Sequence, residues 1–151
     1  MVTKKTVKKE EETKNETAKE AEYFYGLGKR KTSIAQIRIF PVEKTEKGIV
    51  INEKKLDDYF TIGRHREIVR SPLIAVGQEA QFDVSAKVSG GGVSAQCQAV
   101  RLGIARALVK YNGELKKSLR DRGYLTSDAR IVERKKAGLK KARRAPQWAK
   151  R

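Results

Sequence analysis

The sequence has few of the residues that disulfide frameworks and metal centres need: one cysteine and one histidine in 151 residues. A single cysteine, Cys97, forms no internal disulfide, which fits a reducing compartment such as the cytoplasm. No apolar run reaches the roughly 18 residues that span a bilayer. The amino terminus lacks the apolar core of a signal peptide, and its six glutamates are unlike an acid-poor transit peptide. We therefore expect a soluble, cytoplasmic protein.

The sequence also lacks a constellation of residues typical of catalysis. His65 lies between two arginines and has no second type of metal ligand near it, so we interpret it as a surface or RNA-facing residue. Cys97 has no histidine near it in sequence and is interpreted as a small packed residue. Asp57 and Asp58 are adjacent, so on a helix their carboxylates point about 100° apart, and a helix first turn explains them better. We expect no enzyme, no cofactor and no metal site.

Two glycine-containing segments resemble nucleotide-binding loops but fail on spacing or context. A P-loop needs glycine five residues before the Gly28–Lys29 pair and Ser or Thr after it, where this chain has Tyr23 and Arg30. Residues 90–95 have the glycine spacing of a dinucleotide-binding turn. That site also needs a second parallel strand after the helix, and nothing beyond Tyr111 has strand periodicity.

What the chain has in excess is positive charge. It contains 35 Lys and Arg against 18 Asp and Glu, a formal net charge of +17, which is typical of proteins that bind nucleic acid. The six lysines and six glutamates of residues 1–22 cancel, so the excess lies on residues 23–151. Residues 134–151 hold nine basic residues and no acidic one. Such a segment cannot pack into a core, and the anion that we infer for it is RNA.

Apolar patterning divides the chain into an extension, one domain and a tail. Residues 1–22 bury too little apolar area to fold and are predicted to be disordered. Thr32 to Phe40 alternates, with Ala35, Ile37 and Ile39 on one face, and predicts a half-buried strand. Gly48 to Asn52 predicts a second strand, and the short polar connection favours an antiparallel hairpin between the two.

The second half of the domain predicts one more strand and several helices. Leu56 to Phe60 and the segment that follows predict short helical pieces interrupted near Pro72. Phe82, Val84, Ala86 and Val88 alternate in a third strand. A helix is predicted over residues 93–111, and Asn112 and Gly113 end it. A second, short amphipathic helix is predicted around Leu115 and Leu119. This order predicts a two-layer α/β (α+β) sandwich over residues 23–125, a mixed sheet with helices on one face, and an extended basic tail over residues 126–151.

Two short segments of the domain are candidate RNA contacts. Lys29, Arg30 and Lys31 follow two glycines and precede a strand, which fits either a contact to the RNA backbone or a solvated turn. Gly90, Gly91 and Gly92 precede a helix. They fit either a phosphate held by backbone donors at the helix amino terminus or a turn that only needs glycine conformations. The sequence leaves both pairs of alternatives open.

Three segments resemble a known family: YGLGKRKTSIAQIRIFP, SGGGVSAQCQAVRLGIARAL and, above all, GYLTSDARIVERKKAGLKKARRAPQWAKR. They are similar to the bacterial-type ninth protein of the small ribosomal subunit over residues 23–151. The family pattern has Phe and Ser where this chain has Trp148 and Ala149, and Trp148 keeps a ring that can stack. Residues 1–22 are not part of the family core.

The resemblance implies a position in the small-subunit head and a sheet crossover of left-handed sense, against the usual preference. It implies that the tail winds through small-subunit ribosomal RNA beside other head proteins until Lys150 and Arg151 contact transfer RNA in the peptidyl site. Gly138 and Pro146 block a continuous helix, so the tail is expected to be extended. The tail residues that we predict to bind ribosomal RNA are Arg134, Lys135, Lys136, Lys140, Lys141, Arg143, Arg144 and Trp148.

The alternative function is a free-standing, nonspecific nucleic-acid-binding protein. It has the same excess of positive charge but would not need a defined carboxy-terminal motif. Incorporation into ribosomal subunits separates the two.

Overall fold

A five-stranded mixed sheet is the basis of the fold in the part of the chain that the computed structural model describes, residues 23–42 and 48–149. Its spatial order is β1-β2-β5-β3-β4. Strands β3 and β5 run parallel, and the other neighbours are antiparallel. The strands are β1 (Phe24–Arg30), β2 (Ser33–Pro41), β3 (Ile49–Ile51), β4 (Lys54–Lys55) and β5 (Phe82–Ser89).

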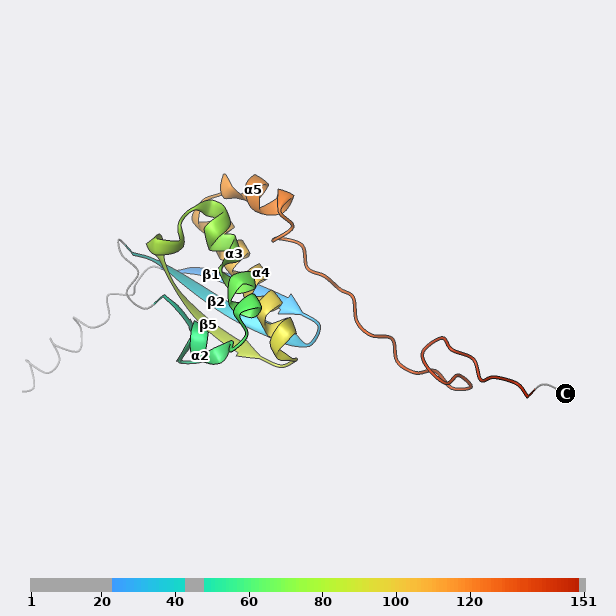
Figure 1. The fold of residues 1–151 in the computed structure, drawn as a ribbon. Helices are drawn as coiled ribbons and strands as arrows, with labels where there is room; N and C mark the ends of the chain where they lie inside the picture. Colours follow the sequence, from blue (N-terminus) through green and yellow to red (C-terminus); the bar gives the residue numbers. More distant parts are fainter. Residues whose placement is uncertain (1–22, 43–47, 150–151) are drawn as a thin grey trace, which may run out of the picture.

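Helices cover one face of this sheet (Figure 1). Helix α4 lies across β1 and β2, and α3 packs beside α4. The helices described are α2 (Leu56–Tyr59), α3 (Gly63–Val76), α4 (Val93–Tyr111) and α5 (Leu115–Asp121), with a 3₁₀ turn η1 (Glu79–Gln81). The predicted α+β sandwich is therefore confirmed, whereas the left-handed sense of the crossover between β3 and β5 stays a prediction.

The alternation of the two central strands separates core from solvent. In β2, Ala35, Ile37 and Ile39 are fully buried under the helices, while Gln36 and Arg38 on the other face are exposed. Strand β5 alternates in the same way. Among the described residues, no helix covers the opposite face of the sheet, and an alternation of apolar and polar residues predicts such an arrangement for a half-buried antiparallel pair.

The hairpin predicted between the first two apolar segments is wrong. Strand β5 lies between β2 and β3 and pairs with β2 over eight residues, whereas β3 has only three residues. A long strand with four buried side chains offers β2 more ladder bonds and more apolar contact than β3 can. Asn52, just after β3, fixes this arrangement because its side-chain amide bonds both the N–H and the C=O of Val88, at 2.8 and 2.9 Å.

Strand β1 was not predicted, because its buried positions are glycines. Gly26 and Gly28 face α4, and an added Cβ would overlap the carbonyl oxygens of Gly103 and Ala99. The strand and the helix thus approach backbone to backbone, which only glycine permits. Apolar periodicity does not detect a strand whose fully buried positions carry no side chain.

Helix α3 is continuous through Pro72, so the predicted interruption is also wrong. Pro72 is buried and has no N–H to donate to the carbonyl of Ile68, four residues earlier. The hydroxyl of Ser71 donates to that carbonyl instead, at 2.8 Å. A neighbouring side chain therefore replaces the missing bond, and packing keeps the helix intact.

The last two helices match the sequence prediction, and the tail follows them. Helix α4 ends at Tyr111, and α5 buries Leu119 with Leu115 beside it. After α5 the chain leaves the sandwich in a long path without helix or strand, which forms a loop over residues 137–143 (Figure 1). No residue in the described range 126–149 is buried.

Candidate nucleic-acid interface

The first candidate contact is the two-residue turn between β1 and β2. Arg30 pairs with Ser33 across it, and Lys31 adopts a positive φ of 53°. Lys29 and Lys31 are exposed, whereas Arg30 is partly buried. The structure therefore places two of the three predicted cations where they can reach an anion, and turns the third inward.

The glycine run lies directly beside this turn. Gly90 and Gly91 have φ values of 70° and 65°, and the hydroxyl of Ser33 donates to the carbonyl of Gly90 at 2.9 Å. An added Cβ would meet Thr32 at Gly90 and Ser33 at Gly91. Conformation and close approach both require glycine at positions 90 and 91, so the turn alone accounts for these two residues, whereas neither requires it at Gly92. A phosphate contact stays a prediction.

Helix α4 begins immediately after the glycines, at the same end of the sheet. Its cap is Gly92, which supplies no side chain to bond the backbone N–H groups of the first turn. The backbone donors of that turn carry the partial positive charge of the helix amino terminus. Together with Lys29 and Lys31 they give this end a positive character suited to phosphate groups.

Arg30 connects this end of the sheet to the base of the tail. Its Nε donates to Oε1 of Gln98 in α4 at 2.9 Å. Its Nη1 donates to the carbonyls of Asp128 and Arg130, at 2.7 and 3.0 Å. Its Nη2 forms an ion pair with the carboxylate of Asp128 at 2.8 Å. The tail therefore begins docked against the β1–β2 turn.

Asp128 is the acidic partner in this cluster. Its carboxylate accepts bonds from the backbone and side-chain nitrogens of Arg130, at 2.9 to 3.2 Å. The bonds from Arg130, with the nearby charge of Arg30, lower the pKa of Asp128 to about 2. Asp128 is therefore ionised at neutral pH. Next to it, the hydroxyl of Ser127 donates a long hydrogen bond of 3.4 Å to the carbonyl of Lys29.

The distal tail is exposed and contains one internal ion pair. The guanidinium of Arg143 donates to the carboxylate of Glu133, with Nε at 2.9 Å and Nη2 at 2.6 Å from the oxygens. This pairing lowers the pKa of Glu133 and raises that of Arg143. Trp148 is 88% exposed. The other predicted tail residues are exposed as well: Arg134, Lys135, Lys136, Lys140, Lys141 and Arg144. Lys150 and Arg151 lie outside the described residues.

Cys97, His65 and Asp57 each contact neighbouring groups of the domain. Cys97 is buried, which raises the pKa of its thiol, and it donates to the carbonyl of Ser94. The ring of His65 lies 6.0 Å from that of Phe60. Asp57, in the first turn of α2, forms an ion pair with Arg66 at 3.0 Å.

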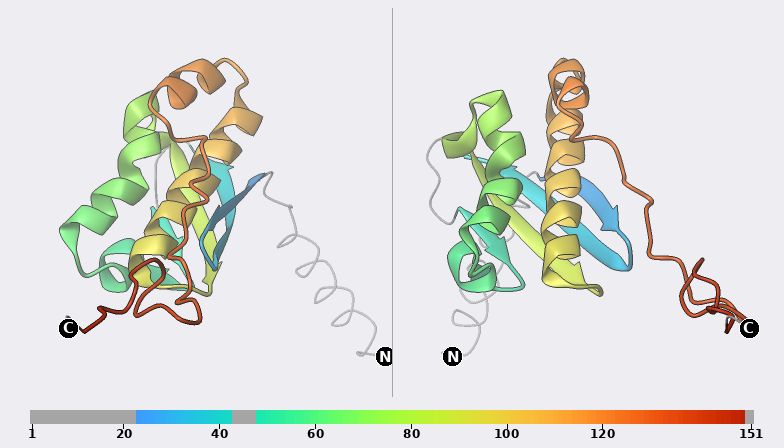
Figure 2. Two further views of the ribbon diagram at one scale, coloured as in Figure 1. Left: turned by 90° about the vertical axis from the view of Figure 1, so that its right-hand side faces the viewer. Right: turned by 45° about the vertical axis from the view of Figure 1, so that its right-hand side comes forward.

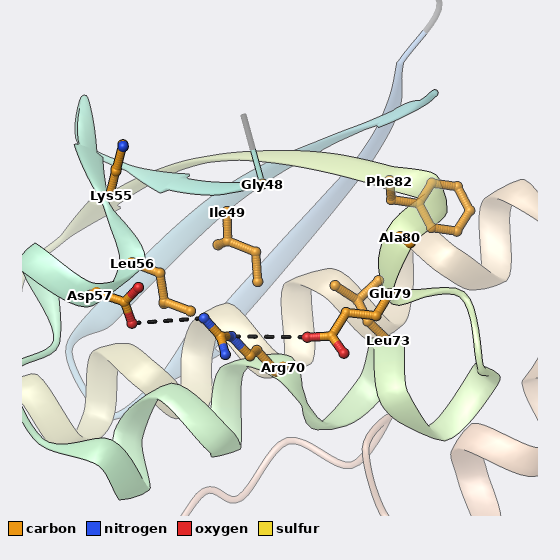
Figure 3. A pocket seen from close by; sticks show the side chains of 10 residues that line it. All are labelled: Gly48, Ile49, Lys55, Leu56, Asp57, Arg70, Leu73, Glu79, Ala80 and Phe82. Atoms are coloured by element: carbon orange, nitrogen blue, oxygen red, sulfur yellow. Dashed lines mark ion pairs between the residues drawn. The ribbon is translucent and has the colours of Figure 1, made fainter. Parts of the chain in front are cut away.

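The open pocket between α2, α3 and the sheet has an apolar floor and a charged rim (Figure 3). Arg70 crosses its rim between Asp57 and Glu79, at 3.7 and 4.0 Å. Lys55 also lines the pocket, so two cations face two carboxylates and no excess charge is left for an anion. The described residues include no group of three metal-ligating side chains and no helix that could cross a membrane.

Sequence reasoning missed the residues that hold the tail. The sequence pattern places Gln98 on a helix, and Asp128 and Ser127 in the extended basic tail, without indicating a contact between them. Arg106 was missed as well; its Nη1 donates to the carbonyl of Leu27 in β1 at 2.7 Å. The one available signal was an acidic residue at 128 in a strongly basic region, which favours an internal ion pair.

The three separate sequence signals converge in space. The basic turn, the glycine turn and the base of the tail meet at one end of the sheet (Figure 2). A family model described as ribosomal protein S9/S16 matches residues 28–151. The chain belongs to this family. It is therefore a structural protein of the ribosome that binds ribosomal RNA and takes part in translation.

Proposed function

We propose that the chain is a constituent of the small ribosomal subunit head, in the cytoplasm. The observation that carries this proposal is the convergence of the basic turn, the glycine turn and the docked tail, in a chain of the S9/S16 family. A single positively charged surface at one end of the sheet suits a protein that binds folded RNA in a fixed position. A protein that binds nucleic acid only through its net charge would not need its basic groups in such an arrangement.

The contacts with RNA divide by their chemistry. Lys29 and Lys31 on the turn supply charge to phosphates without reading bases. The donors after Gly92 at the start of α4 can hold one phosphate. The exposed tail residues follow the RNA backbone, and Trp148 can stack on a base for roughly 1 to 3 kcal/mol. Arg30 is not included, because the base of the tail occupies its guanidinium.

At the tip of the tail, we further propose that Lys150 and Arg151 contact the backbone of transfer RNA in the peptidyl site. Contacts to phosphate suit a site that must accept every transfer RNA, because phosphates do not differ between them. Other head proteins are the remaining partners of the domain.

Sedimentation of lysate from cells with a tagged copy tests the proposal, followed by a high-salt wash of the ribosomal peak. We expect one copy in each small subunit, retained after the wash. Release into the soluble fraction at moderate salt would instead support the alternative, a free-standing nonspecific nucleic-acid-binding protein, because its affinity falls steeply with salt.

A further inference from the structure

The guanidinium of Arg30 is bonded to protein groups at each of its nitrogens. The side chain is 13% exposed, and all three of its nitrogens have partners. Gln98 of α4 accepts from Nε, two tail carbonyls accept from Nη1, and the carboxylate of Asp128 accepts at Nη2. A planar fork with five donors can serve this set of acceptors, and a lysine ammonium cannot.

The contacts of Arg30 lie where the tail leaves the domain. Just before them, the guanidinium of Arg101 lies 5.6 Å from the ring centre of Tyr124, and the N–H of Tyr124 bonds Leu119 of α5. Farther along, the tail diverges from the sandwich (Figure 1). Arg30 is therefore the last strongly bonded point before the free segment, and its geometry sets the direction in which that segment departs.

We propose that Arg30 is a positioning residue: it binds the tail base at Asp128 and Arg130, sets the exit direction of the tail, and does not contact RNA. This deepens the proposed function, because a tail aimed in advance loses less orientational freedom on reaching its site. It also separates the three consecutive cations of the turn, since Lys29 and Lys31 remain available for phosphate.

The first test is pulsed electron–electron double resonance on the free, full-length chain, which measures the distance between two spin labels and needs no RNA. Spin labels at Ser85→Cys on the exposed sheet face and Ala137→Cys in the tail, in a Cys97→Ala background, report the tail direction. We expect Arg30→Ala to broaden the distance distribution at least twofold, Arg30→Lys to broaden it as well, and Lys31→Ala to leave it unchanged. An unchanged distribution in Arg30→Ala would overturn the proposal.

The pairing with Asp128 is tested in the same assay. Asp128→Ala should broaden the distribution as Arg30→Ala does, and the double variant should broaden it no further, because both remove one docking contact. Additive broadening would mean that Arg30 acts by another route, and would contradict the proposal.

Binding to a small-subunit ribosomal RNA transcript separates positioning from direct contact. Loss of one phosphate contact lowers the slope of log K against log salt by about one. We expect Lys31→Ala to lower the slope and Arg30→Ala to leave it unchanged while weakening binding. An equal loss of slope in both variants would show that Arg30 contacts RNA. If the wild-type chain does not bind the transcript, the proposed function fails, whereas the distance measurement still decides the role of Arg30.

Discussion

Single residues in this protein act mainly by what they allow a neighbour to do. Gly28 lets α4 approach β1, Ser71 replaces the hydrogen bond that Pro72 cannot make, and Arg30 holds the tail. None of these roles is visible in residue type alone. Each depends on a partner supplied by the fold, and each can be tested by one substitution.

At Gly28 we expect alanine to be strongly destabilising, because its methyl group would overlap the carbonyl of Ala99. Overpacking of this kind costs about 1 to 3 kcal/mol. Urea unfolding followed by circular dichroism measures the change. Gly113→Ala is the matched control, since nothing lies within 4 Å of an added Cβ there. Equal stability of the two variants would disprove the close approach.

The local structure of the tail base should depend on pH through Asp128. Its folded pKa is about 2, below the ordinary 3.8, first because of the bonds from Arg130 within the tail and to a smaller extent because of the charge of Arg30, so ionised Asp128 stabilises these contacts above about pH 4. That contribution is lost as pH falls from about 4 through 2. Hydrogen exchange at residues 127–130 measures it. Asp128→Asn should remove the pH dependence and Glu133→Gln should keep it; the reverse result would assign the effect to the other ion pair.

At the scale of elements, α3 shows packing overriding local propensity. Pro72 predicts a break, yet the helix buries Val69, Pro72 and Leu73 along one side and stays continuous. Strand β1 shows the converse case, an element with weak propensity that exists because α4 and β2 hold it on two sides. Elements with strong alternation, such as β2 and β5, follow the sequence closely.

For α3 we expect Ser71→Ala to destabilise the protein by about 0.5 to 1.5 kcal/mol, because the carbonyl of Ile68 then loses its donor. Ser118→Ala is the control, since that hydroxyl makes the same type of bond to Leu115 on an exposed surface. Chemical denaturation gives both values. A larger loss at Ser118 would mean that the Ser71 bond does not compensate for the proline.

At the scale of the whole molecule, a rigid sandwich carries a directed, charged tail. The tail base is bonded to the β1–β2 turn, and the distal part is exposed and contains the Glu133–Arg143 ion pair. That surface pair is weak enough to exchange for phosphate. Under the proposed function, the domain anchors the protein in the ribosome and the tail supplies reach.

Removal of Lys150 and Arg151 should leave incorporation into small subunits intact and weaken transfer RNA in the peptidyl site. Two lost phosphate contacts predict a salt slope smaller by about two. Filter binding of transfer RNA to purified subunits measures this, with Trp148→Ala as a comparison that we expect to cost less. Subunits that fail to assemble without the two residues would contradict the separation of anchor and tip.

The sequence by itself determined the basic tail, the alternating strands, the long helix α4 and the family resemblance, because charge and periodicity are local properties of the chain. Only the tertiary structure decided that β5 lies between β2 and β3, that glycines form β1 against α4, and that Arg30 holds Asp128, 98 residues away. These depend on contacts between distant segments, where length of pairing, steric fit and available acceptors determine the outcome, and none of these is encoded in a local pattern.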